Sequence, residues 1–211
     1  MALTNLTYAA PDNKAFICRR LTNLEALLAQ LETGNEELKQ VSASVLRNLS
    51  WRTDSKSKAA LRRVCAAKRL TIAAMSAQRE STLRTTLSAL WNLSAHCSHN
   101  KRAVCSVDGV FSFLLRMLHL QNPMQNLVII ENSGGILRNI STVIASHDDY
   151  RSTLHKHNCY PVLLELLRNP PSLTVVVNVC GTLWNLTCSP INNNTINTNG
   201  GNICVSSNTT T

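Results

Sequence analysis

Aromatic residues are scarce in this sequence: Phe, Trp and Tyr make up 4% of its 211 residues, although 44% of the residues are hydrophobic. The core must therefore be packed from Leu, Val, Ile and Ala, which suits layers of helices better than stacked sheets. No stretch approaches the roughly 20 consecutive apolar residues of a membrane-spanning helix. The N-terminus also lacks a basic segment followed by an apolar run, so we expect neither a transmembrane segment nor a signal peptide.

Paired cysteines are missing as well. None of the eight cysteines forms a CxxC pair, which excludes zinc-ribbon and thioredoxin-like spacings. Most of them lie in apolar helical patterns, where Cys behaves as a small hydrophobic residue. Reduced thiols are typical of the cytosol, so we expect a cytoplasmic protein that reaches the cytoskeleton or the plasma membrane only through partners.

Catalytic motifs are absent too, because the sequence contains no GxSxG, GxGxxG or P-loop pattern. Two clusters of His and Cys, at residues 96–99 and 155–159, do not have a recognised metal-ligand spacing. We therefore expect no enzymatic activity, no metal and no cofactor.

Acidic residues are outnumbered in only one half of the chain. Residues 1–102 carry 16 Lys and Arg against 7 Asp and Glu, whereas residues 103–211 carry five of each kind. The whole net charge of +9 therefore belongs to the first half. This distribution favours acidic partners at that half; a solvated basic surface without a partner is the alternative.

What the sequence does contain is one recurring heptapeptide. It is written SVLRNLS at residues 44–50, SALWNLS at 88–94, GILRNIS at 135–141 and GTLWNLT at 181–187, with a partial copy at residues 2–7. The central asparagines are Asn5, Asn48, Asn92, Asn139 and Asn185, which are 43, 44, 47 and 46 residues apart. A period of forty-odd residues with helices between the copies is typical of armadillo and HEAT solenoids.

Three helices are expected in each unit, with the motif on the last one. The expected ranges are 14–20, 24–31 and 36–52; 54–66, 70–77 and 80–95; 99–107, 110–120 and 124–145; and 148–156, 162–168 and 172–187. Residues 1–188 are thus predicted to form one repeat domain that is truncated at both ends. The Asn- and Thr-rich segment 189–211 is predicted to be disordered.

The positions around each asparagine predict two faces of the motif helix. Positions −2 and +1, counted from the asparagine, are always aliphatic and lie on one helix face, which we expect in the core. Position −4 is small in four of the five copies, and we expect it to leave room for another backbone. Positions −1 and +3 carry several Trp and Arg residues, which are enriched at binding hot spots.

Two interpretations of the asparagines remain open. Asn offers two donor hydrogens and one acceptor oxygen, so a row of asparagines can bind the backbone of an extended peptide. Alternatively, each asparagine braces a neighbouring helix. All five also match the glycosylation pattern N-x-S/T, but that modification requires an exposed loop of a secreted chain, so we reject it.

The motifs resemble the armadillo domain of the adenomatous polyposis coli (APC) family. The similarity is carried by VLRNLSW at residues 45–51, LSALWNLSAHC at 87–97, SGGILRNIS at 133–141 and CGTLWNL at 180–186, and it extends over about residues 1–188. It implies an all-α, right-handed superhelical solenoid of three-helix repeats. It also implies a groove that binds extended segments of signalling and cytoskeletal partners, such as a Rho-family exchange factor, a kinesin-associated adaptor and a membrane-recruiting scaffold.

The resemblance also predicts which residues line the groove and which functions are missing. With Asn185 added from the repeat itself, the groove residues are Asn5, Tyr8, Lys14, Arg47, Asn48, Trp51, Trp91, Asn92, Arg138, Asn139, Trp184 and Asn185. The APC regions that bind β-catenin, axin and microtubules lie beyond the armadillo domain. The chain is therefore expected to act as a fragment of an APC-like negative regulator of Wnt/β-catenin signalling, with β-catenin bound only through regions absent here.

Two other binding functions fit less well. An importin-like armadillo receptor holds basic signals with acidic residues, whereas the neighbours of the asparagines here include Lys14, Arg47 and Arg138. A nucleic-acid-binding solenoid would need more stacking aromatics than this chain offers, and no recognised RNA-binding motif is present.

Overall fold

The computed structural model describes residues 2–188, so the segment 189–211 that we expected to be disordered lies outside the described residues. Between residues 2 and 188 the chain forms thirteen α-helices and one 3-10 helix, and it contains no strand. The predicted all-α architecture is thereby confirmed. None of these helices is long and apolar enough to cross a bilayer.

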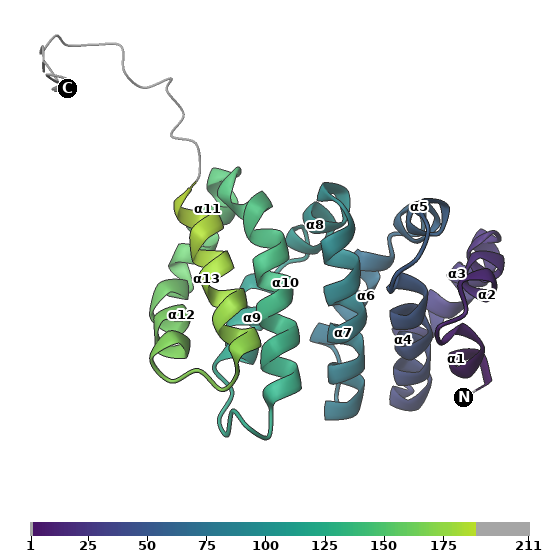
Figure 1. Ribbon diagram of the computed structural model, residues 1–211, viewed down its shortest axis with the longest axis horizontal. Helices are drawn as coiled ribbons and strands as arrows, with labels where there is room; N and C mark the ends of the chain where they lie inside the picture. The colour runs from purple at the N-terminus through teal and green to yellow at the C-terminus, as the bar shows by residue number, and fades with distance from the viewer. Residues whose placement is uncertain (1, 189–211) are drawn as a thin grey trace, which may run out of the picture.

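The helices recur in groups of three behind a short first helix (Figure 1). The motif helices are α1 (Ala2–Thr7), α4 (Glu36–Ser50), α7 (Glu80–His96), α10 (Leu127–Ala145) and α13 (Leu173–Thr187). Each later one follows a first short helix, namely α2 (Pro11–Cys18), α5 (Ser55–Arg63), α8 (Ser98–Cys105) or α11 (Asp148–Lys156). A second short element comes between them: α3 (Leu21–Ala29) with η1 (Gln30–Glu32), α6 (Ala66–Met75), α9 (Val110–Leu118) or α12 (Cys159–Arg168).

The motif helices stand side by side and form one layer. Helix α4 packs against α1 and α7, α7 against α10, and α10 against α13. The second short helices pack behind this layer, α6 on α7, α9 on α10 and α12 on α13, while α5, α8 and α11 lie along one edge (Figure 1). Since each unit contacts its neighbours in the same way, the chain is a solenoid.

Side-chain caps fix where several helices begin. Asn35 Oδ1 accepts from the backbone N–H groups of Glu37 and Leu38 at the start of α4, at 3.0 and 3.1 Å. Asp54 does the same for α5, as the sequence predicted, and Ser172 Oγ accepts from Val175 N at the start of α13. These bonds satisfy amide hydrogens that have no partner inside the helix.

The turn between the two short helices needs a left-handed residue in three of the units. Cys65, Gly109 and Asn158 have φ angles of 53°, 76° and 55°. Glycine and asparagine adopt this conformation readily, whereas other residues are strained there. Cys65 is therefore the least suited of the three residues to its turn.

The predicted core face of the motif helices is confirmed in the middle of the solenoid and wrong at its first copy. Leu46, Leu49, Leu90 and Leu93 are at most 1% exposed. By contrast, the two equivalent leucines of α1 are 45% and 58% exposed: Leu3 and Leu6. Among the described elements α1 packs mainly against α2 and α4, which leaves its leucine face largely uncovered.

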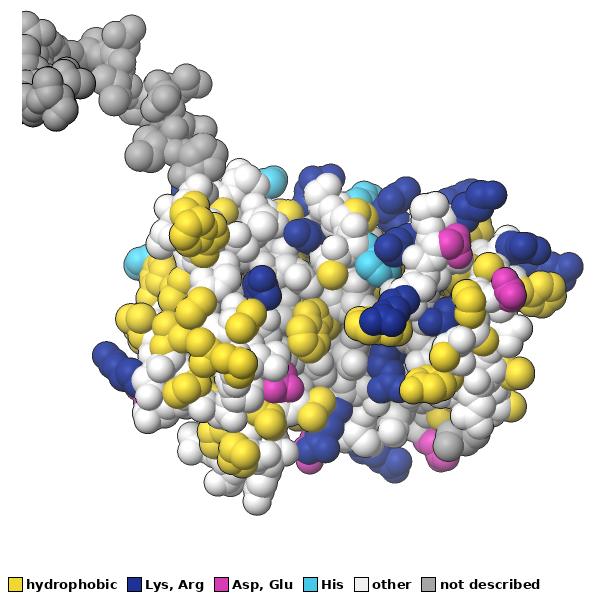
Figure 2. Space-filling model, viewed as in Figure 1, with side chains coloured by type: hydrophobic (Ala, Val, Ile, Leu, Met, Phe, Trp, Pro, Cys, Tyr) yellow, Lys and Arg dark blue, Asp and Glu magenta, His cyan; other side chains and the backbone are white. Residues whose placement is uncertain are grey.

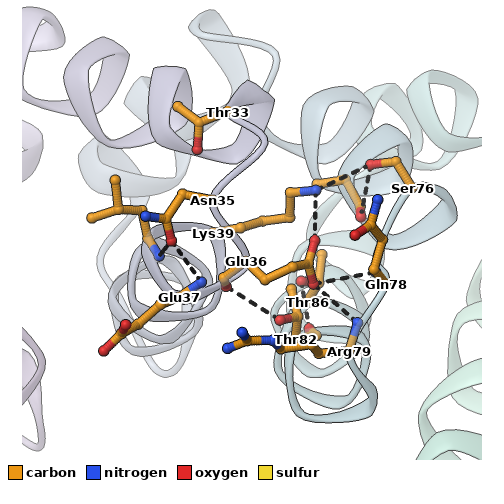
Figure 3. Close-up of polar contacts among 12 residues, drawn as sticks. Thr33, Asn35, Glu36, Glu37, Lys39, Ser76, Gln78, Arg79, Thr82 and Thr86 are labelled. Atoms are coloured by element: carbon orange, nitrogen blue, oxygen red, sulfur yellow. Dashed lines mark hydrogen bonds and ion pairs between the residues drawn. The ribbon is translucent and has the colours of Figure 1, made fainter.

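A buried ion pair lies at the start of α4, and its carboxylate also binds the turn before α7 (Figure 3). Lys39 Nζ lies 3.1 Å from Glu36 Oε1, and both side chains are less than 10% exposed. Glu36 Oε2 also accepts from the backbone N–H groups of Gln78 and Arg79, at 3.2 and 3.1 Å. Although burial opposes ionisation, these donors together lower the pKa of Glu36 to about 2.

Candidate functional site

The motif asparagines link successive motif helices. Asn92 Nδ2 donates to the backbone oxygen of Arg47 and to Ser50 Oγ, both at 3.3 Å. Asn139 Nδ2 donates in the same way to Trp91 O at 3.3 Å and Ser94 Oγ at 2.9 Å. The same pair of bonds joins Asn48 to Thr4 O and Thr7 Oγ1, and Asn185 to Arg138 O and Ser141 Oγ.

This arrangement explains the N-x-S/T pattern without glycosylation. The hydroxyl two residues after each asparagine donates to a carbonyl of its own helix, as Ser94 Oγ does to Trp91 O at 2.9 Å. It also accepts from the asparagine of the next unit. Between successive motif helices, the asparagine of the later tripeptide thus supplies the donor, and the hydroxyl of the earlier tripeptide supplies an acceptor. We call this pair of bonds the inter-repeat clasp.

The interpretation that each asparagine braces a neighbouring helix is therefore supported. The other interpretation, in which the row of asparagines binds the backbone of an extended peptide, is left with fewer free hydrogen-bonding atoms. The Nδ2 group of Asn48, Asn92, Asn139 and Asn185 donates inside the solenoid, and because its carbonyl and hydroxyl acceptors are hydrogen-bonded to each other, one N–H is shared between them. Within residues 2–188, no donor reaches the Oδ1 atoms of these four side chains. Their Oδ1 atoms can therefore accept from the N–H groups of a bound strand.

The glycines at position −4 make room for a side chain, so our expectation that the small residues there admit another backbone was wrong at Gly135 and Gly181. A Cβ atom on Gly135 would lie 2.2 Å from Trp91 Cε2, and one on Gly181 would lie 2.5 Å from Arg138 Nε. At these two places the residue at position −1 of one unit therefore lies directly on position −4 of the next.

Seven of the twelve predicted groove residues line one open cavity of about 1100 Å³ between α1 and α10. They are Tyr8, Lys14, Arg47, Asn48, Trp51, Trp91 and Asn92. The cavity lining contains four Lys and Arg side chains and no carboxylate. Figure 2 shows Lys and Arg gathered around a hollow on this face, between α4 and α7.

The other five predicted residues lie outside this cavity. Asn5 is exposed on α1. Arg138 and Asn139 on α10, and Trp184 and Asn185 on α13, continue the same row along the solenoid. Trp184 is 70% exposed, so it is available for contact although it is not in the cavity.

Lys14 differs from the other cations because it is used inside the fold. Its ammonium group donates to Trp51 O at 2.9 Å, and its side chain is 4% exposed. Burial lowers the pKa of Lys14. Lys14 therefore holds the end of α4 in place, and the more accessible charges of the cavity belong to Arg47, Arg52 and Lys58.

Nine lining residues were missed by the sequence prediction, and four of them carry a charged, imidazole or amide side chain: Arg52, Lys58, His96 and Asn132. Arg52 and His96 each come four residues after a motif asparagine, one helical turn further on, so the repeat itself could have identified them. His96 Nε2 lies 2.9 Å from Ser50 O, and because a carbonyl only accepts, Nε2 carries the proton. Its Nδ1 is buried and has no partner, and burial lowers the pKa of His96, with a further contribution from Lys58.

Metal chemistry finds no support in the part of the chain that the structure describes. There, no group of three His, Cys, Asp or Glu side chains is placed to hold a metal ion. The seven cysteines between residues 2 and 188 are free thiols.

Solved structures with the same fold are armadillo-repeat and engineered proteins. A designed armadillo repeat protein in complex with the peptide (KR)4 matches 87% of this chain and 80% of its own, with a TM-score of 0.60 and 16% identity. An engineered protein matches 88% of this chain and 70% of its own, with a TM-score of 0.72 and 16% identity. At this identity the likeness shows the fold alone, and it confirms the predicted armadillo architecture.

Curated relatives are much closer in sequence. The human adenomatous polyposis coli protein and the Xenopus laevis homolog are each 52% identical over 88% of this chain, and human adenomatous polyposis coli protein 2 is 50% identical over the same share. The chain spans only 6% to 8% of the length of these proteins. These matches confirm the resemblance to APC proteins.

A family model matches almost the whole chain. The model described as "Protein zer-1 homolog-like, C-terminal domain" covers residues 2–206. This chain, with its APC-like sequence and armadillo-repeat fold, therefore belongs to the zer-1 homolog-like C-terminal domain family.

Proposed function

We propose that this chain is a non-catalytic module that captures extended, acidic segments of other proteins. The observation that carries the proposal is the cavity of about 1100 Å³, because four Lys and Arg side chains line it and no carboxylate does. Such a lining attracts a negatively charged chain and repels a positively charged one.

The spacing of the motif helices suits an extended peptide. Packed helices lie about 8–10 Å apart, and an extended strand advances about 3.3 Å per residue. A bound strand would therefore meet a motif asparagine every two to three residues and donate its N–H groups to the free Oδ1 atoms. Trp51 and Trp91 beside the asparagines would supply apolar contact area for its side chains.

The sign of the charge separates this groove from an importin-like one. The designed armadillo protein of similar fold holds the basic peptide (KR)4. Here Arg47, Arg52 and Lys58 would repel such a ligand, and within the described residues none of them forms an ion pair. We propose acidic ligands for that reason.

The likeness to APC proteins suggests which biology the module serves. We propose that it is part of an APC-like negative regulator of Wnt/β-catenin signalling in the cytoplasm, where its free thiols would stay reduced. By that resemblance its partners are a Rho-family exchange factor, a kinesin-associated adaptor and a membrane-recruiting scaffold. Contact with β-catenin would need other regions of such a protein.

Calorimetric titration with two matched extended peptides, one carrying Glu and the other Lys at alternate positions, tests the proposal. We expect the Glu peptide to bind the full chain and the Lys peptide not to bind. The variant Arg47→Gln/Lys58→Gln should lose most of the affinity, because it removes two of the cations that line the cavity. Its fold should stay intact, because neither side chain forms a hydrogen bond within the described part of the solenoid.

The control is Arg116→Gln/Lys156→Gln, which removes the same charge from exposed positions outside the cavity. It should bind the Glu peptide with little change in affinity. Binding of the Lys peptide, or equal losses in both variants, would refute the acidic-groove proposal. Asn→Ala variants are less suitable here because they also remove the inter-repeat clasp.

A further inference from the structure

A second group of cations lies on the first half of the solenoid, outside the groove. It consists of Arg19, Arg20, Lys56, Arg62 and Arg63, which we call the basic rim. All five side chains are exposed, and none of them lines the groove cavity. Figure 2 shows Lys and Arg side chains gathered over α5 and the adjacent α2, at one end of the edge formed by the first short helices.

Lys56, Arg62 and Arg63 lie on the exposed side of α5, and Arg19 and Arg20 lie between the end of α2 and the start of α3. On α5 the buried stripe consists of Ser57 and Leu61, and Lys56 and Arg63 lie seven residues apart on one exposed side. On α2 the buried residues are Lys14 and Cys18. The two helices pack against each other, so their cations lie close together at this end of the molecule.

The cations of the basic rim form no ion pairs, unlike Lys39, Arg69 and Arg84 in the same half. Arg69 on α6 is held by Glu25 and Glu32, at 2.6 and 2.7 Å, and Arg84 is paired with Glu80. Among the ion pairs within residues 2–188, none involves a basic-rim residue. Five cations without an ion pair therefore lie on α5 and just after the C-terminal end of α2.

Carboxylates near the basic rim do little to neutralise it. Asp54 is already engaged at the start of α5, where it accepts from Lys56 N, Ser57 N and Ser57 Oγ at 2.6 to 2.9 Å. Asp12 on α2 is exposed and forms no ion pair. One free carboxylate thus stands against five free cations.

An exposed aromatic residue accompanies the charges. Phe16 on α2 is 65% exposed, and Arg19 follows it by three residues on the same helix face. An exposed aromatic ring beside flexible basic side chains is typical of surfaces that lie at a lipid interface, where the ring enters the headgroup region and the cations meet anionic lipids.

We propose that the basic rim, with Phe16, docks on the anionic surface of a membrane. Clusters of four to eight Lys and Arg bind acidic lipid headgroups, and the basic rim falls within that range. The surface is a helical edge rather than a cavity, so it suits a broad charged plane better than a single extended peptide. Because the basic rim does not line the groove, a docked chain would keep its peptide site open.

Co-sedimentation with vesicles tests this inference on the full chain. We expect it to bind vesicles that contain phosphatidylserine and not to bind vesicles of phosphatidylcholine alone. The variant Lys56→Gln/Arg62→Gln/Arg63→Gln should lower the partition coefficient about 100-fold, since each removed cation contributes roughly one factor of five. Phe16→Gln should produce a smaller loss.

Three controls decide between the outcomes. The triple variant Arg116→Gln/Lys156→Gln/Arg168→Gln removes the same charge from exposed residues elsewhere and should bind vesicles like the unmodified chain. The groove variant Arg47→Gln/Lys58→Gln should keep most of the vesicle binding, which separates this inference from the proposed peptide site. Thermal unfolding of every variant checks that its fold is intact.

Two results would overturn the proposal. One is an equal loss of vesicle binding in the basic-rim and control triple variants, which would mean that only net charge matters. The other is binding to a soluble polyanion, such as heparin, through the basic rim while phosphatidylserine vesicles are not bound, which would assign the surface to a soluble acidic partner.

Discussion

The two halves of the solenoid share one architecture and differ in charge. Helices α4 and α7 in the first half, and α10 and α13 in the second, each bond the preceding motif helix through an asparagine. The first half holds the groove cations and the basic rim, whereas in the second half Arg151 and Arg168 are paired with Asp148 and Glu165. The residues that repeat thus build the fold, and the residues that differ between units are available for recognition.

A second difference lies at the starts of the motif helices. Glu36 opens α4 and is buried with Lys39, whereas the residues at the same distance before the asparagines of α10 and α13 are Leu127 and Leu173. The first half therefore depends on an ionised group for its stability. The second half starts these helices with apolar residues and does not carry that dependence.

The largest expected effect comes from Glu36→Gln. It leaves the buried ammonium of Lys39 without its carboxylate, and breaking such a pair costs about 3 kcal/mol of the free energy of unfolding. Because the pKa of Glu36 is lowered from 4.5 to about 2, its stabilisation is complete above pH 4.5 and is lost as the pH falls toward 2. Urea unfolding between pH 7 and pH 3 measures both effects.

In the variant, the loss of stability on acidification should be smaller than in the unmodified chain. Hydrogen exchange can localise the effect, which we expect at α4 and the turn before α7. A uniform loss of protection along the solenoid would argue against the contrast between the halves, and so would an unchanged acid sensitivity.

Gly135→Ala and Gly181→Ala should differ although both lie at position −4. The new Cβ would be 2.2 Å from the Trp91 ring at the first site and 2.5 Å from Arg138 Nε at the second. A rigid, partly buried ring cannot move aside easily, so we expect Gly135→Ala to lose about 2 kcal/mol of stability. The flexible Arg138 can move, and the helix preference of Ala then makes Gly181→Ala neutral or stabilising by up to about 1 kcal/mol. Equal losses of stability in urea unfolding would contradict this reading of the two contacts.

Acidification should strengthen peptide binding at the first half. His96 is neutral near pH 7 because burial lowers its pKa below the ordinary value of 6.5. Below that pKa, Nδ1 gains a proton and adds a charge to the cavity that also holds Lys58 on α5, Arg47 and Arg52 at α4, and Lys14 on α2.

We expect the affinity for the Glu peptide to rise about threefold to tenfold as the pH falls from 7 through the lowered pKa of His96. Calorimetry in two buffers of different ionisation enthalpy would detect the accompanying proton uptake. His96→Gln should remove the pH dependence, whereas His99→Gln, at an exposed residue outside the cavity, should leave it. A pH dependence that persists in His96→Gln would assign the proton to another group.

The smallest expected effect is a gain of stability at a turn. Cys65 adopts a left-handed conformation with φ of 53°, where the second half uses Gly109 and Asn158. Cys65→Gly removes the strain but increases the freedom of the unfolded chain, so the net gain should be about 0.5 kcal/mol. Asn158→Gly is the matched control and should gain less, because Asn tolerates this conformation. A loss of stability in Cys65→Gly, measured by thermal unfolding, would mean that the Cys65 side chain contributes packing.

Much of this arrangement was predictable because it repeats. The spacing of the asparagines and the aliphatic residues at −2 and +1 identified the motif helices, and seven of the predicted groove residues share one cavity. The inter-repeat clasp was predicted only as one of two alternatives. The sequence of one motif helix does not show whether its asparagine, such as Asn92, bonds to Ser50 of the neighbouring helix or to a ligand.

The features that do not repeat were the ones missed. Glu36 looks like an ordinary first-turn carboxylate, and only the approach of the Gln78 and Arg79 amides makes it a buried anion. Lys58 carries no motif, and its place in the groove depends on how α5 lies beside α4. Leu3 and Leu6 follow the pattern of a core face, but their exposure depends on which helices surround α1.

The contact between Trp91 and Gly135 also limits how such a chain can be rearranged. Trp91 requires a following unit without a side chain at position −4, and the units that carry Ser44 or Ser88 there cannot take that place. The segment that can be exchanged or duplicated is therefore not the three-helix unit between two turns. It runs from the middle of one motif helix to the middle of the next, so that a bulky residue at position −1, such as Trp91, keeps the small residue at position −4 of the next unit that accommodates it. A designed recombination of these units should therefore place its junctions in the middle of the motif helices.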